Sequence, residues 1–180
     1  NRLGHPPYLR RVKRDWSIAT LERFDDRMEG FFDEASRAFD FMIVRSKDYM
    51  NWRYCEPAAG RFTVRIAEQD GRMLGYLVFK ISEGTGWVAD LLVLPDRREV
   101  ARSLIEDALG AFRVAGTESA TCWMISRHPY NRMLRKYGFA DSKGDVGFEY
   151  RAITVDGAEV GFLDDSRARI HLTHGDSDWI

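Results

Sequence analysis

The stretch from Trp87 to Val114 constrains the fold more than any other part of the chain. It reads WVADLLVLPDRREVARSLIEDALGAFRV, which is an apolar run, a proline and then apolar residues at helical spacing. The apolar run predicts a strand over 87–94, and the spacing after Pro95 predicts a helix that ends before Gly116. A strand that turns directly into a helix is typical of an α/β domain.

Strand and helix patterns alternate around this junction. Two β-rich runs flank the turn residues QDGR and predict a hairpin over 61–81. We predict three further strands, at 120–126, 147–155 and 168–173, and a short helix at 129–137. Upstream, we predict a long helix over 18–39 capped by Ser17 and a shorter helix capped by Ser46 that stops before Pro57.

This order of elements predicts an α/β domain whose mixed, mostly antiparallel twisted sheet is flanked by helices. The sheet should be antiparallel at its start and parallel across the helical crossovers. A chain of 180 residues, 44% of them apolar, suits one hydrophobic core. We therefore predict a basic connector at residues 1–16 and a single domain at residues 17–180.

Charge and composition argue against several classes of partner. The chain has 27 basic and 28 acidic residues, so no overall field attracts nucleic acid. Its apolar runs are shorter than the roughly 18 residues that a membrane span needs. Cys55 and Cys122 lie far apart without metal-type spacing, which predicts no disulfide scaffold and no zinc site. We expect a cytoplasmic protein that binds neither nucleic acid nor membranes.

The sequence from about residue 61 to Phe139 resembles the GNAT superfamily of N-acetyltransferases. In that family a strand ending in V-x-P-x-x-R leads into a loop, R-x-x-G-x-G/A, whose amides hold the coenzyme A pyrophosphate. Val93, Pro95 and Arg98 match this pattern, and NRMLRKYGF matches a short helix that ends in G-F. The resemblance implies a GNAT-like fold, acetyl-CoA as co-substrate, no metal and a small-molecule or peptide amine as acceptor. The residues that it implies for coenzyme binding are Leu92, Val93, Arg98, Glu99, Val100, Ala101, Arg102, Ser103 and Asn131.

Two departures from the family pattern bear on chemistry. Ala101 and Ser103 stand where the family has glycines, which allow close approach of the backbone to phosphate, although the serine hydroxyl could itself donate to phosphate. Leu134 stands where many members carry a tyrosine that protonates the leaving thiolate. Tyr137 and Tyr130 are the candidate replacements, and the alternative is that both are buried or rim tyrosines.

Removal of a proton from the acceptor ammonium group needs a base or a water path. Asp90 is the leading candidate because it lies inside an otherwise apolar strand, where an isolated charge is costly. Glu68 and His128 are weaker candidates. The alternative for Asp90 is an aspartate at a strand edge that meets Arg53 or solvent.

The leading function is therefore an acyl-CoA dependent N-acyltransferase, and the alternative is a catalytically silent GNAT-like module. RSKDYMNWRYCEP resembles larger bacterial GNAT-like proteins with two tandem halves, so a missing upstream half stays open. A strand edge near the C-terminus leaves a homodimer open as well. In the tandem hypothesis Trp52, Arg53 and Tyr54 are candidates for lining the acceptor groove, and the favoured alternative is a helix that packs one aromatic face on the sheet. Three residues near the end of the chain have side chains that can bind a metal, namely His174, Asp176 and Asp178. The favoured interpretation is a polar turn before Trp179.

Overall fold

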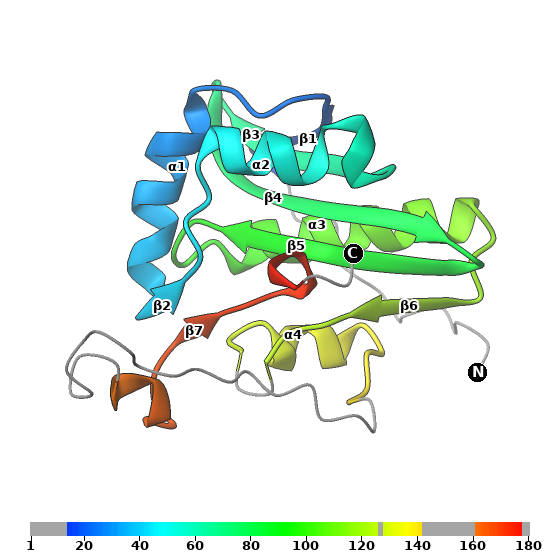
Figure 1. Cartoon of the computed structure of the whole chain (residues 1–180). Helices are drawn as coiled ribbons and strands as arrows, with labels where there is room; N and C mark the ends of the chain where they lie inside the picture. Colours follow the sequence, from blue (N-terminus) through cyan, green and yellow to red (C-terminus); the bar gives the residue numbers. More distant parts are fainter. Residues whose placement is uncertain (1–13, 126–127, 142–160, 178–180) are drawn as a thin grey trace.

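The computed structural model describes residues 14–125, 128–141 and 161–177 (Figure 1). A five-stranded sheet has the order β1-β3-β4-β5-β6. All neighbours in it pair antiparallel except β5 and β6, which are parallel. The prediction of a mixed, mostly antiparallel sheet is confirmed. The strands are β1 (Ser17–Leu21), β3 (Thr63–Gln69), β4 (Arg72–Ser82), β5 (Thr85–Val93) and β6 (Ser119–Cys122).

Helices cover both faces of this sheet. Figure 1 shows α3 behind the sheet and α2 in front of it, with α1 alongside. A small parallel pair, β2 (Phe41–Met42) with β7 (Ile170–His171), lies beside the main sheet. The α-helices are α1 (Arg27–Ala35), α2 (Lys47–Tyr54), α3 (Arg98–Val114) and α4 (Asn131–Lys136). The short 3-10 helices are η1 (Ser36–Ala38), η2 (Pro57–Ala59), η3 (Gly161–Asp164) and η4 (His174–Asp176).

Several elements form where local sequence signals place them. Asp70 and Gly71, with φ of 51° and 77°, make the tight turn between β3 and β4, as the QDGR signal predicts. The hydroxyl of Ser46 accepts from the backbone N of Tyr49 at 3.1 Å and caps α2. The predicted α3 is confirmed, and Gly116 follows it with φ of 70°.

The predicted helix over 18–39 is wrong in its first part. Residues Ser17–Leu21 form β1, which pairs with β3, and Ser17 is therefore no helix cap. Ile18 and Thr20 are β-branched and fit a pleated strand, while the apolar residues at helical spacing continue only in α1. The order of elements thus begins with a strand.

The core fills the space between the helices and the sheet. Met28 of α1 and Leu104 of α3 are fully buried. Each such side chain contributes about 1.5–3 kcal/mol by leaving water. No helix in the described ranges is long and apolar enough to cross a membrane. The predicted strand at 147–155 and most of the predicted connector at 1–16 lie outside the described residues, and the predicted strand at 168–173 is represented by β7.

Candidate functional site

The strands β5 and β6 pair over only half of their length. Their ladder runs from Thr85 and Ser119 to Val88 and Cys122. In the described part of the chain beyond it, Met124 instead forms an isolated antiparallel bridge with Thr173. Residues 89–93 of β5, here called the β5 edge, are therefore approached by segments other than β6.

A β-bulge sets the direction of Asp90. The register between β4 and β5 shifts between Val78 and Phe79, because Val78 pairs with Asp90 and Phe79 with Val88. Ala89 is thus the extra residue in β5. Strict alternation would place Trp87 and Asp90 on opposite faces, yet Trp87 stacks on His174 and Asp90 contacts Thr173 of the same segment. The bulge therefore turns Asp90 toward residues 173–177, here called the closing turn.

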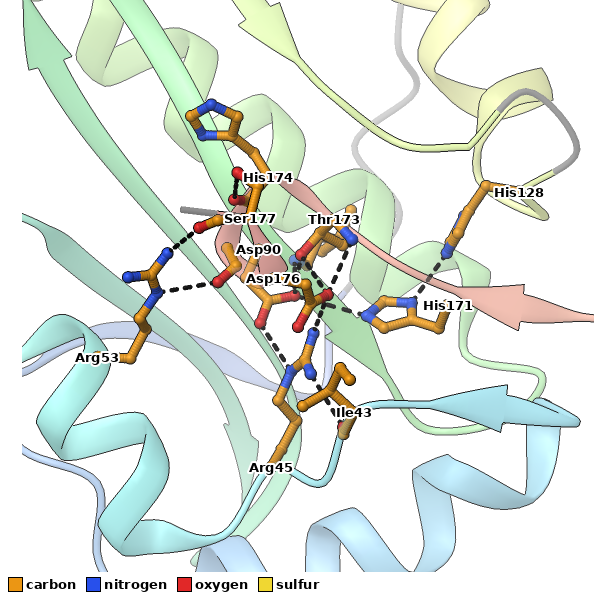
Figure 2. A network of polar contacts seen from close by, with 12 residues as sticks. Ile43, Arg45, Arg53, Asp90, His128, His171, Thr173, His174, Asp176 and Ser177 are labelled. Atoms are coloured by element: carbon orange, nitrogen blue, oxygen red, sulfur yellow. Dashed lines mark hydrogen bonds and ion pairs between the residues drawn. The ribbon is translucent and has the colours of Figure 1, made fainter. Parts of the chain in front are cut away.

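Asp90 is fully buried at the centre of a polar network (Figure 2). Arg45, also fully buried, donates from Nε to Asp90 at 3.0 Å and from Nη2 to Asp176 at 2.7 Å. Tyr76 donates its hydroxyl to Asp90 at 3.0 Å, and Thr173 does so at 3.3 Å. Arg45 lies between two carboxylates that are 86 residues apart in sequence and compensates both.

The electrostatics make Asp90 a weak base. Burial opposes its ionisation, but the charge of Arg45, the neighbouring His171 and the hydrogen bond from Tyr76 hold the pKa of Asp90 well below its usual range. Its carboxylate is therefore ionised and paired at neutral pH. Arg53, the partner considered for Asp90 in the sequence, instead donates to backbone carbonyls of the closing turn. The role of Asp90 as a base stays a prediction.

The closing turn packs against α2 and β5. Arg53 donates to the carbonyl oxygens of Gly175, at 2.9 Å, and Ser177. Gly175 leaves no room for a side chain, because a Cβ there would overlap the Tyr54 hydroxyl and lie 3.2 Å from the Ala89 oxygen. Arg53 and Tyr54, predicted for an acceptor groove, thus contact the protein's own chain.

The other residues predicted in this region are placed differently. Trp52 is 62% exposed on α2, and its acceptor role stays a prediction. Glu68 on β3 pairs with Arg27 at 2.8 Å. Among the described residues no group of histidine, cysteine and carboxylate side chains is arranged to hold a metal ion. Asp178, named in that hypothesis, lies outside the described residues.

Tyr130 and two histidines lie next to the β5 edge. The hydroxyl of Tyr130 accepts from the backbone N of Val93 at 3.2 Å. His128 Nε2 lies 2.8 Å from His171 Nδ1, and His171 Nε2 lies 3.5 Å from Asp90 Oδ1. Burial, followed by the neighbouring His171, lowers the pKa of His128 well below 6.5. Burial raises the pKa of Tyr130, so its hydroxyl keeps its proton at neutral pH.

Tyr137 belongs to another surface. Its hydroxyl donates to Glu106 of α3 at 2.9 Å, and burial together with this bond raises its pKa. Of the two candidate tyrosines, only Tyr130 contacts the β5 edge in the described structure. Both catalytic assignments stay predictions.

The start of α3 presents charge to solvent and buries its small residues. Arg98 and Arg102 are exposed, while Ala101 is fully buried and Ser103 is 3% exposed. Ser103 Oγ donates to the carbonyl of Glu99 at 2.9 Å, so its proton is used within the helix.

The remaining residues predicted for coenzyme binding are mostly internal. Leu92 and Val93 are buried in β5, and Val100 is buried in α3. Asn131 donates Nδ2 to the carbonyl of Ile125 at 2.9 Å and ties α4 to the segment after β6. Their contacts with a coenzyme stay predictions.

Comparisons with known proteins identify the fold. No family model and no curated protein sequence matches this chain. Among solved structures, a glucosamine-6-phosphate N-acetyltransferase from Arabidopsis thaliana superposes with a TM-score of 0.58 at 13% identity, covering 77% of this chain and 100% of that one. An aminoglycoside acetyltransferase from an uncultured soil metagenomic sample, in complex with sisomicin, gives 0.55 at 16%, covering 77% and 97%.

A further match is a putative acetyltransferase of the GNAT family from Desulfovibrio desulfuricans, with a TM-score of 0.53 at 19% identity, covering 71% of this chain and 86% of that one. This chain has the GNAT fold. AAC(6')-Iy, in complex with a bisubstrate analog of coenzyme A, gives a TM-score of 0.50 at 16% identity and covers 76% and 99%. At these identities the likeness establishes the GNAT fold alone.

Sequence reasoning missed part of the network around Asp90. Arg45 carries a weak signal, since it is the charged residue that directly follows the apolar run FMIV. His171 lies in a short run of alternating character, where a buried histidine cannot be told from an exposed one. The pairing of Arg45 with Asp176 spans 131 residues, and no local pattern indicates it.

Proposed function

We propose that this protein is an acyl-CoA dependent N-acyltransferase that acylates an amine of a small molecule or peptide. The observation that carries the proposal is the β5 edge, which parts from β6 beside Tyr130 and leads directly into the N-terminus of α3. The GNAT fold supports it, since the acetyltransferases that superpose on the chain share this architecture.

The start of α3 suits a pyrophosphate. The first N–H groups of a helix lack partners within it, and the dipole favours an anion there. Arg98 and Arg102 add exposed positive charge at this end. Because Ala101 and Ser103 are buried, their side chains point to the core and leave the phosphate side clear. This supports coenzyme A binding despite the missing glycines, with the pantetheine chain along Leu92 and Val93.

The chemistry at the β5 edge is direct transfer, with a new C–N bond replacing the C–S bond of the thioester. Tyr130 accepts from Val93 N–H, so its own proton can be given to the departing thiolate sulfur. The ammonium proton of the acceptor leaves through Asp90 or water. A backbone N–H of the strand stabilises the oxyanion.

A second candidate is a catalytically silent GNAT-like module that binds a partner. The closing turn favours it, because Gly175 packs over the Ala89 carbonyl on the α2 side of β5. The ion pair of Asp90 with Arg45 favours it too, since a paired carboxylate of low pKa takes up a proton poorly.

Calorimetric titration with coenzyme A and acetyl-CoA tests the proposal. We expect a dissociation constant near micromolar, about 8 kcal/mol. Arg98→Ala should weaken binding about tenfold by removing one charge-assisted contact. Arg113→Ala, at the opposite end of the same helix, is the matched control and should leave binding unchanged. No binding at millimolar ligand would refute the proposal.

Thiol release then separates the enzyme from the silent module. With a panel of amines and acetyl-CoA, the enzyme should release free coenzyme A in an amine-dependent manner. Tight coenzyme binding without amine-dependent release would favour the silent module instead.

A further inference from the structure

We propose that His128 and His171 are positioning residues that hold Tyr130 against the β5 edge. The proposal rests on the function proposed above, in which Tyr130 gives its proton to the leaving thiolate. Its basis is a directed chain of contacts. Two hydrogen bonds join the backbone N–H of Tyr130 to His128 and His128 to His171, and His171 Nε2 then lies 3.5 Å from Asp90 Oδ1, within ion-pair distance (Figure 2 shows the part from His128 to Asp90).

Tyr130 needs support from outside its own helix. It is the residue directly before α4, which has six residues, and a helix of that length is not stable by itself. The hydroxyl of Tyr130 meets Val93 N–H at 3.2 Å, a long hydrogen bond that small shifts of α4 would break. A second tie, from its backbone to a fixed group, would keep the hydroxyl in register with β5.

The hydrogen bonds fix the tautomer of each imidazole. Tyr130 N–H donates to His128 Nδ1 at 3.1 Å, so that nitrogen carries no proton. A neutral His128 must then carry its proton on Nε2, which lies 2.8 Å from His171 Nδ1 and donates to it. His171 in turn carries its proton on Nε2, which faces Asp90 Oδ1 at 3.5 Å. Only one arrangement of protons satisfies both hydrogen bonds, and it leaves the proton of His171 facing Asp90.

The far end of the chain is rigid. Asp90 accepts from Arg45 Nε, the Tyr76 hydroxyl and its neighbour's backbone N at 3.0, 3.0 and 2.9 Å. The ring of Phe39 packs against His171 and His128, with centroids 4.8 and 5.8 Å away. A shift of His128 would therefore have to move groups held on several sides.

Burial makes this arrangement expensive for a purely structural role. His171 is fully buried and His128 is 3% exposed. Removing two polar rings from water costs free energy that apolar side chains of similar size would not cost. Two apolar side chains in place of His128 and His171 would not provide a fixed hydrogen-bond acceptor for the backbone N–H of Tyr130, whereas the histidines do.

Two substitutions of His128 separate the two ends of its ring. In His128→Asn the side-chain oxygen replaces Nδ1 and still accepts from Tyr130, while the donor to His171 is lost. In His128→Gln the amide nitrogen replaces Nε2 and still donates to His171, while the acceptor for Tyr130 is lost. Because the two variants are similar in polarity, they control for each other.

Amide hydrogen exchange at Val93 is the readout that does not require activity. Tyr130→Phe removes the acceptor of Val93 N–H and should accelerate its exchange about tenfold, as one lost hydrogen bond allows. His128→Gln should do the same, and His128→Asn should stay within about twofold of wild type. The proposal is overturned if His128→Gln leaves Val93 unchanged, or if it accelerates the β4 amides equally. Nitrogen-15 spectra of the imidazoles that place a proton on His128 Nδ1 would also overturn it.

Activity supplies the second arm. His128→Gln should lower kcat about tenfold with KM for acetyl-CoA unchanged, and His128→Asn should restore most of kcat. Equal kcat in both variants would contradict a role in positioning the proton donor. If the chain binds no coenzyme A, the proposed function fails, whereas the exchange rates at Val93 still test the positioning by the two histidines.

Discussion

Replacing Arg45 with methionine should cost a large part of the stability of this protein. Methionine matches the length of the arginine stem but leaves Asp90 and Asp176 without the buried guanidinium that donates to both at 3.0 and 2.7 Å. Removing one partner of a buried ion pair typically costs about 3–5 kcal/mol. Hydroxyl groups and one backbone N–H still donate to Asp90, so we expect about 3 kcal/mol for Arg45→Met.

Urea unfolding at pH 7 measures this loss directly. Arg23→Met is the matched control, because Arg23 pairs with Glu56 at 3.0 Å on the surface with 59% of its side chain exposed. That variant should lose less than about 1 kcal/mol. The double variant Arg45→Met/Asp90→Asn should recover part of the loss by removing one uncompensated charge. A loss below about 1 kcal/mol for Arg45→Met would refute the assignment of Arg45 as the essential counter-charge.

Three further predictions test packing and titration. The pKa of His128 is lower in the folded state than its ordinary 6.5, so the folded chain binds fewer protons below that pH. The contribution of His128 to the free energy of unfolding should therefore be constant above pH 6.5 and fall by up to about 1.4 kcal/mol per unit below it. Urea titrations of His128→Asn should show a smaller fall, and the part that remains belongs to groups such as His174, whose pKa burial also lowers. Gly175→Ala should displace the closing turn and make it more sensitive to limited proteolysis, because the added Cβ overlaps the Tyr54 hydroxyl. Adding Tyr54→Phe to this variant removes that hydroxyl and should partly restore protease resistance. Gly86→Ala places a Cβ 2.5 Å from Phe112 Cγ and should lower stability by about 1–3 kcal/mol in thermal unfolding, and an unchanged melting temperature would contradict the packing.

Local signals in the sequence predict most of the central sheet. Short local patterns predict the turn at Asp70 and Gly71, the helix cap at Ser46 and the start of α3 after Pro95. The turn and both helices form at these positions. The helix predicted directly after Ser17 is wrong because the apolar residues at 18, 21 and 24 have helical spacing although the segment begins as a strand. Pairing with β3 settles the choice, and that partner lies about 45 residues away.

The candidate site is less predictable because its chemistry is set by burial and long-range pairing. Asp90 stands out as a charge in an apolar strand, but the sequence offered Arg53 or solvent as its partner, whereas the fold pairs it with Arg45. The sequence offers both Tyr130 and Tyr137 as candidate proton donors. Tertiary packing places the hydroxyl of Tyr130 against Val93 and that of Tyr137 against Glu106.

The pairing of Arg45 with Asp176 across 131 residues also has a consequence for biosynthesis. A ribosome releases the chain from its beginning, so α2 and the β3–β5 meander emerge long before the closing turn does. Until Asp176 leaves the exit tunnel, Arg45 has only Asp90 as its counter-charge, and the face of β5 that carries Trp87 is uncovered. Nascent chains stalled with residue 176 still inside the exit tunnel should therefore bind chaperones that recognise exposed apolar surface, and chains in which residue 176 has left the tunnel should not.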